Sequence, residues 1–396
     1  MKPDGSLGYE LALLRRLVSF RTFSPEEKGY SACAEFVARE GKRIGAKVKR
    51  FSPKAKGGVP MPNLIISLNR GAKETLLLIT HYDTVPAGEG WGKRDPFRLL
   101  LKRGIVYGRG AGDDKGAIAA ALGAMRELAH GKKLRRNVKL AVACDEENGG
   151  AYGMGYLAKH CRHALKADAA LVIDSDAKIV EHGCSGTVSA ELTLTGAEGH
   201  AACPHLNRNA LEEALPFLVS LVREYKKLRE KKRSKANACR GKFPKVWGRF
   251  SLTVLNAGQK TNMFPDRVSA KFDIRALPEE SAGEVMREFR SFVKRMVRKH
   301  KLARFRPRLS LKGSTGYLTP ENAEFIRELR ANLRGITGKK FRACAVLGAD
   351  DGRFVARLGI PVAGFGPGGK NEHSPRESIS LRNIALTKEL IKRCCL

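Results

Sequence analysis

Residues 75–86 read Thr-Leu-Leu-Leu-Ile-Thr-His-Tyr-Asp-Thr-Val-Pro, and this stretch decides the fold. The run at 75–80 is typical of a parallel strand buried on both faces. His81 and Asp83 follow two residues apart, so their side chains point the same way at the carboxyl end of the strand. Open α/β sheets bind ligands at that end. A histidine with a nearby carboxylate is a common pairing of a metal ligand with the group that orients it.

The segments around this strand alternate between strand and helix patterns. Strands are expected at 137–144 and 169–173, and helices at about 114–130 and 151–161. This alternation predicts an α/β domain in which helices cover both faces of a parallel or mixed sheet.

After Gly183 the pattern changes to period two, which is typical of half-exposed antiparallel strands. Strands are expected at 187–194, 249–255 and 267–275, with helices at about 208–233 and 279–300. The first pattern then returns, with a helix from 321, strands at 343–347 and 361–365, and a closing helix from 381. We therefore predict a discontinuous α/β/α domain (1–183 and 312–396) with an inserted α+β domain (184–311), two helices on an antiparallel sheet.

The composition narrows the class of protein. The 396 residues include 74 Lys and Arg against 40 Asp and Glu, a net charge of +34. This charge allows contact with nucleic acid or an acidic protein. The basic residues are spread along the chain, however, which favours a solvated basic surface. Nine scattered cysteines, with no Cys-x-x-Cys pair, favour free thiols in a cytoplasmic protein. No apolar run is long enough to cross a bilayer.

Metal-binding types of side chain follow strands at five places in the discontinuous domain. They are His81 with Asp83, Asp113 in the Gly-rich turn 107–116, Asp145-Glu146-Glu147, Asp174 with Asp176, and His373 in a Gly-rich loop. Imidazole and carboxylate ligands without thiolate suit Zn, Mn or Co. These groups are too many for one catalytic ion, so the pattern predicts two ions about 3.5–4 Å apart that share a carboxylate.

Four motifs resemble those of the zinc-dependent aminoacylase, carboxypeptidase and acetylornithine/succinyl-diaminopimelate deacylase superfamily of co-catalytic metallohydrolases. They are His81-x-Asp83-x-Val85-Pro86, Gly108-Arg109-Gly110-x-x-Asp113-x-Lys115-Gly116, Asp145-Glu146-Glu147, and the Gly-Pro-Gly loop before His373. They run in the order of the superfamily and cover essentially the whole chain. The resemblance implies a two-metal catalytic domain and an insert that acts as a lid and dimerises.

The resemblance also implies a ligand set, with zinc as the expected metal and cobalt or manganese as alternatives. One ion would be held by His81, Asp113 and Asp174, and the other by Asp113, Glu147 and His373. Asp83 would orient His81. Glu146 would be the general base that takes a proton from the attacking water and passes it to the leaving amine.

Within the insert, the stretch Glu198–His205 resembles the one whose first histidine stabilises the tetrahedral oxyanion in a partner's site, which makes His200 that residue. Asn262 lies in a segment that resembles substrate-contacting ones. Arg275 would bind a substrate carboxylate bidentately, and Arg353 is a weaker candidate for the same task.

Two departures from the superfamily pattern matter. Asp174 stands where glutamate is more common, which favours the dipeptidase branch and leaves Asp176 as an alternative ligand. The basic stretch 226–249 lengthens the insert and has no assigned role.

The resemblance thus implies a homodimeric hydrolase that cleaves an amide bond in a small substrate with a free carboxylate, either a dipeptide or an N-acyl amino acid. One alternative is a biosynthetic deacylase acting on N-acetylornithine or N-succinyl-diaminopimelate. Another is a non-catalytic binding protein on the same fold.

Overall fold

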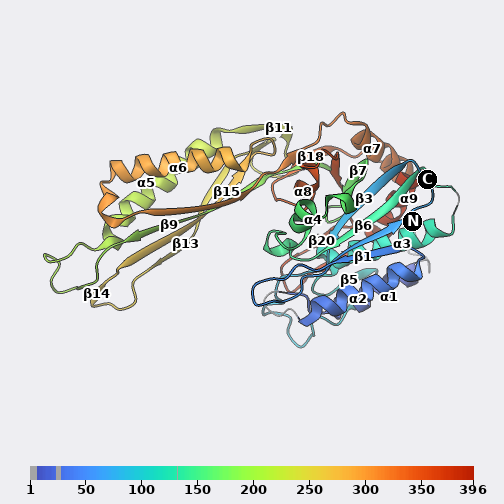
Figure 1. Ribbon diagram of the computed structural model, residues 1–396, viewed down its shortest axis with the longest axis horizontal. Coiled ribbons are helices and arrows are strands. Elements are labelled where there is room, and N and C mark those ends of the chain that lie inside the picture. Colours follow the sequence, from blue (N-terminus) through green and yellow to red (C-terminus); the bar gives the residue numbers. More distant parts are fainter. Residues whose placement is uncertain (1–6, 24–27, 132) are drawn as a thin grey trace. The chain divides into compact units, whose positions relative to one another are not determined.

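The computed structural model describes residues 7–23, 28–131 and 133–396, which divide into two compact units (Figure 1). The first unit combines Met1–His182, Thr319–Cys344 and Asp350–Leu396, and the second combines Gly183–Leu318 with Ala345–Ala349. The second unit contains the insert expected at 184–311 and extends beyond it. The difference arises because a further strand, β16 (Arg308–Ser314), pairs with β9 (Gly186–Thr195) of the second sheet.

The first unit is built on a mixed sheet with the order β1-β2-β6-β3-β7-β19-β8. The strands are β1 (Lys47–Phe51), β2 (Asn63–Leu68), β3 (Glu74–His81), β6 (Arg136–Ala143), β7 (Ala169–Val172), β8 (Val180–Cys184) and β19 (Val362–Gly364). Strands β6, β3, β7 and β19 are parallel, whereas β1, β2 and β8 pair antiparallel to their neighbours. The predicted mixed α/β sheet is confirmed.

Both faces of β3 are buried, as its continuous apolar run predicts. Leu76 and Leu78 belong to a core cluster shared with the helices on one face, whereas Leu77 and Ile79 are equally buried but lie outside that cluster. The helices of this cluster are α1 (Gly8–Val18), α2 (Lys28–Arg43), α3 (Gly116–Ala129), α7 (Glu324–Thr337) and α9 (Leu381–Cys395). Elsewhere α4 (Met154–His160) packs on α8 (Gly352–Ala356), which contacts β7 and β19.

A small antiparallel sheet connects two distant parts of the first unit. Its order is β20-β21-β5-β4, with β4 (Leu100–Lys102), β5 (Ile105–Tyr107), β20 (Gly369–Lys370) and β21 (Ser378–Ser380). The loop that carries His373 runs between β20 and β21, and the Gly-rich turn that carries Asp113 follows β5. The pairing of β21 with β5 therefore brings these two segments together.

The second unit is an antiparallel sheet, β13-β15-β9-β16, with two helices on one face (Figure 1). Its main elements are β9, β13 (Arg249–Ala257), β15 (Arg267–Ala276), β16, α5 (Ala210–Lys231) and α6 (Ala282–Lys299). Shorter strands are β10 (Gly199–His200), β11 (Arg233–Asn237), β12 (Lys245–Trp247) and β14 (Met263–Phe264). Two further short strands, β17 (Tyr317–Leu318) and β18 (Ala343–Val346), belong to the mixed sheet, where each pairs with β8. A capping box between Ser281 and Glu284 fixes the start of α6.

The basic stretch 226–249 has a structural role that its sequence did not indicate. The helix expected to continue to 233 ends at Lys231, and β11 then pairs antiparallel with β12. Arg229 is fully buried and forms ion pairs with Glu280 and Glu288. Part of the positive charge here therefore anchors α5 inside the second unit.

The expectation of free thiols throughout is wrong for two cysteines, because Cys239 and Cys344 are disulfide-bonded. No helix within the described ranges combines the length and apolar character that a membrane crossing requires.

Candidate metal centre

His81 ends β3 with its ring buried and both nitrogens facing oxygen atoms. Nδ1 lies 3.0 Å from the backbone oxygen of Asp83 and 3.4 Å from its carboxylate. Nε2 lies 3.0 Å from Oδ1 of Asp113 and 3.6 Å from Oδ2 of Asp174. A ring that donates its Nδ1 hydrogen to Asp83 presents the lone pair of Nε2 to a metal ion.

Asp113 lies between two histidines and uses one carboxylate oxygen for each. Its Oδ1 faces His81, and its Oδ2 lies 3.0 Å from Nε2 of His373. Burial disfavours the charged form, but hydrogen bonds from His373 and His81 outweigh it and lower the pKa of Asp113. The hydrogen bond to Asp113 in turn raises the pKa of His373 to about 9.

The described residues form two groups that could hold metal ions, and Asp113 belongs to both. Within each group the ligand atoms lie within 4.8 Å of one another, and the groups are His81, Asp113, Asp174 and Asp113, Glu147, His373. The residues predicted from the sequence thus come together from five segments. The donor set is imidazole and carboxylate, which fits divalent zinc, cobalt or manganese.

A buried carboxylate outside the predicted set holds the turn that carries Asp113. Oε1 of Glu377 accepts the backbone N–H groups of Gly112 and Asp113 at 3.0 and 3.2 Å. Oε2 pairs with the buried guanidinium of Arg109 at 2.5 Å. A Cβ at Gly112 would lie 2.9 Å from Cα of Gly369, so only glycine allows this close approach.

We expect Glu377→Gln to weaken metal binding and to destabilise the first unit, because it leaves the Arg109 guanidinium buried without a counter-charge. Breaking a buried pair on one side costs about 3–5 kcal/mol. Glu74→Gln is the matched control, since Glu74 is half exposed where it pairs with Arg136. Titration of the apo-protein with zinc and thermal unfolding would measure both effects. Equal metal affinity in the two variants would contradict the prediction.

Glu146 and Glu147 follow β6 on a short turn that begins at Asp145, whose φ is +71°. The fully buried carboxylate of Asp83 accepts both of their backbone N–H groups at 3.1 Å. Asp83 therefore connects the orientation of His81 with the placement of these two acids. Glu147 lies 3.1 Å from Nε2 of His373, and burial together with Asp113 raises the pKa of Glu147 to about 7.

The side chain of Glu146 is 16% exposed and lies beside a charged cluster. Burial and the nearby Asp351 raise the pKa of Glu146 well above its ordinary value. Nη1 of Arg353 lies 3.8 Å from its Oε1. The Arg353 guanidinium is itself buried and donates to the backbone oxygens of Asp350 and Gly149. It therefore contacts the predicted general base.

Asp174 and its alternative as a metal ligand, Asp176, have different surroundings. Asp174 lies in the first metal group, whereas Oδ1 of Asp176 accepts the N–H of Lys178 within a turn.

The remaining predicted residues, His200, Asn262 and Arg275, lie in the second unit. His200 pairs with Met263 where β10 meets β14, and its Nδ1 accepts the N–H of Ala202 at 3.1 Å. A neutral His200 ring consequently carries its hydrogen on Nε2. The backbone oxygen of Asn262 accepts the N–H of Ala201.

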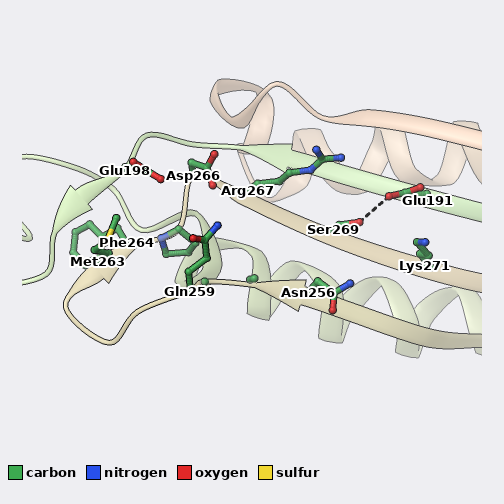
Figure 2. Close-up of a pocket in the computed structure, with 13 residues that line it drawn as sticks. Glu191, Glu198, Asn256, Gln259, Met263, Phe264, Asp266, Arg267, Ser269 and Lys271 are labelled. Atoms are coloured by element: carbon green, nitrogen blue, oxygen red, sulfur yellow. Dashed lines mark hydrogen bonds between the residues drawn. The ribbon is translucent and has the colours of Figure 1, made fainter.

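The segment after Asn262 lines a cavity of the second unit. Figure 2 shows Met263, Phe264 and Asp266 there, with Glu198 on the facing loop. Arg275 forms an ion pair with Asp273 at 2.8 Å. Its register partner is Arg249, which donates to Ser185 and to the backbone oxygen of Leu347.

Sequence reasoning missed Glu377 and Arg249. The one local signal for Glu377 is its position four residues after His373. Nothing in the sequence around Arg249 indicates that this residue faces Arg275.

Comparison with known proteins agrees with this geometry. The profile of peptidase family M20/M25/M40 matches residues 77–396. An uncharacterised metallohydrolase of Methanocaldococcus jannaschii is 27% identical, over 87% of this chain and 86% of its own length. The succinyl-diaminopimelate desuccinylase of Leptothrix cholodnii is 26% identical, over 97% of both chains. The M20 family metallo-carboxypeptidase Sso-CP2 of Sulfolobus solfataricus superimposes with a TM-score of 0.78 at 21% identity, covering 97% of this chain and 98% of its own.

Proposed function

Because this chain belongs to peptidase family M20/M25/M40, a family of metallohydrolases, we propose that it uses two divalent ions to hydrolyse an amide bond in a small substrate with a free carboxylate. The observation that carries the proposal is the position of Asp113, which turns one oxygen to His81 and the other to His373. A carboxylate in this position can bridge two ions. We assign zinc to both positions, with cobalt and manganese as alternatives.

When bound, the ions supply a polarised carbonyl and a more acidic water. Glu146 takes the proton of that water and delivers it to the leaving amine, a task that suits a carboxylate whose pKa is raised by burial. Asp83 orients His81 and holds the backbone of Glu146. We assign Arg353 to positioning Glu146 rather than to binding substrate, because its guanidinium is buried against backbone oxygens.

Substrate carboxylate recognition is assigned to Arg275. Arg275 and Arg249 are register partners on neighbouring strands, and like charges in such a pair repel each other unless an anion lies close. Asp273 neutralises part of this charge. A dipeptide or N-acyl amino acid supplies the required carboxylate, and Asn262 is a further candidate for substrate contact. The desuccinylase relative makes a biosynthetic deacylase the second candidate, acting on N-succinyl-diaminopimelate or N-acetylornithine.

The second unit is proposed to act as a lid and as the interface of a homodimer in the cytoplasm. Strand β13 is the last strand of its sheet, with Val254 and Leu255 38% and 41% exposed. An exposed apolar edge of this kind is a ready template for pairing with another chain. His200 then serves a partner copy, and its Nε2 hydrogen stabilises the oxyanion.

Mixed dimers test the role of His200 in a partner site. His200→Ala and Glu146→Ala should each be inactive alone. Random reassembly should restore about a quarter of wild-type activity, since half the dimers are mixed and each then has one intact site. His205→Ala is the matched control and should keep its activity. If reassembly restores nothing, His200 does not act across the dimer.

Turnover of a substrate panel tests the function itself. We would assay dipeptides, N-acetyl and N-succinyl amino acids with zinc, manganese or cobalt, before and after chelation. The proposal expects hydrolysis of at least one carboxylate-bearing substrate, its loss on chelation and its recovery with added metal. Metal binding without any turnover would instead favour the non-catalytic binding protein.

A further inference from the structure

A cavity of about 940 Å³ in the first unit lies beside β4 and β5. Its walls come from α1, from the segment Trp91–Gly108, and from the residues on either side of His373. None of the five candidate metal ligands is among the described residues that line it. It is therefore distinct from the metal centre, although it shares a loop with it.

The lining is strongly basic. Seven of its seventeen residues are Lys or Arg, whereas the whole chain has 74 in 396, and a single acid, Asp95, accompanies them. The seven are Arg15, Lys93, Arg94, Arg98, Lys102, Lys370 and Arg376. We call this site the basic cavity.

Some basic residues elsewhere in the unit form ion pairs with acidic side chains. Lys388 and Lys392 share Glu127, and Arg136 pairs with Glu328. Within the part of the chain that the structure describes, none of the seven forms an ion pair with an acidic side chain. Like charges that line one cavity repel each other, and among the described lining residues Asp95 is the one acid that could offset them.

We propose that the basic cavity binds a small anion that carries several phosphate groups. Guanidinium and ammonium groups match phosphate oxygens in charge and geometry, and one carboxylate would leave most of the seven charges unneutralised. The volume lies in the range of small-molecule sites, about 300–1,000 Å³, which favours a compact ligand over a polymer. The hydroxyl of Tyr107 and the amide of Asn371 add neutral polar groups.

One wall of the basic cavity carries its own spectroscopic reporter. Trp91 is half-buried and its Nε1 donates to the backbone oxygen of Ala87 at 2.9 Å, which holds the ring in place. The chain has two tryptophans, Trp91 and Trp247. In a Trp247→Phe background, fluorescence changes therefore report on Trp91 alone.

The test is a fluorescence titration of the metal-loaded protein with tripolyphosphate, inorganic phosphate and a single-stranded oligonucleotide. The metal content is measured before and after, so that chelation is separated from binding. The variant neutralises three exposed cations of the cavity by Arg94→Gln, Arg98→Gln and Lys102→Gln. The matched control removes the same charge from an exposed basic groove elsewhere in the unit, by Arg327→Gln, Arg334→Gln and Lys340→Gln.

We expect tripolyphosphate to bind more tightly than phosphate and to change the Trp91 signal. Loss of three charges from the cavity lining should weaken the binding of tripolyphosphate about tenfold or more, whereas the control should change affinity less than about twofold. Equal weakening in the two triple variants would mean that the net charge of the protein, and not the cavity, determines binding, and would overturn the proposal. Binding unchanged in the cavity variant, or an oligonucleotide that binds more tightly than tripolyphosphate, would overturn it as well.

Discussion

Glu146→Gln should retain both metal ions and lose nearly all turnover, by about 10²–10⁴-fold. The amide keeps the shape of the side chain, its contact with Arg353 and the backbone hydrogen bond to Asp83. What it removes is the group that accepts the proton of the attacking water. Steady-state kinetics on the substrate found in the panel, with metal analysis of the same sample, would measure the two properties separately.

Two comparisons make the result for Glu146 interpretable. Glu89→Gln carries the same substitution at an exposed position and should leave both turnover and metal content unchanged. A Glu146→Gln protein with two ions and a tenth of wild-type activity would remove Glu146 as the base. Loss of metal together with activity would mean that the side chain contributes to the metal centre instead.

Asp113→Asn should have the largest effect on metal content, because Asp113 belongs to both groups of candidate ligands. An amide offers one oxygen, and its NH₂ group cannot bind a cation. We expect the bound metal to fall from two ions per chain to one or fewer, and turnover to fall at least about 10³-fold, since a two-metal site requires both ions. Elemental analysis after dialysis would measure the content.

Asp174→Asn and Asp176→Asn are the matched comparisons for Asp113. Asp174 belongs to one group only, so its variant should lose about one ion. Asp176 caps a turn, so its variant should keep both. Retention of two ions by Asp113→Asn would contradict a bridging role, and loss of an ion from Asp176→Asn would reverse the choice between the two aspartates.

Local sequence patterns predicted the central strands and several long helices, but not β1, β2, β8 or β16. The apolar run before His81 became β3, buried on both faces, and the period-two stretches became β9, β13 and β15. These predictions succeeded because side-chain periodicity depends on near neighbours along the chain. The hairpin of β11 and β12 was missed because β11 directly follows the charged helical pattern of α5 and both strands are short. Only the pairing between them distinguishes the hairpin.

The candidate site depends both on the local sequence and on contacts between distant segments. The types of residue that could bind metal, and their positions after strands, were readable from the sequence. The sequence did not show that the two oxygens of Asp113 face two different histidines. His373 lies 260 residues away and reaches Asp113 through the pairing of β21 with β5. Likewise, Glu377 supports the Asp113 turn across 265 residues.

By itself the sequence determined the α/β pattern, the inserted unit and the kind of ligand, because each depends on short-range periodicity and on side-chain chemistry. Only the tertiary structure decided which oxygen faces which nitrogen, that Arg353 contacts Glu146, and that seven basic residues line one cavity. Those contacts arise from packing between distant segments, where the free energy depends on burial and on the final distances between charges.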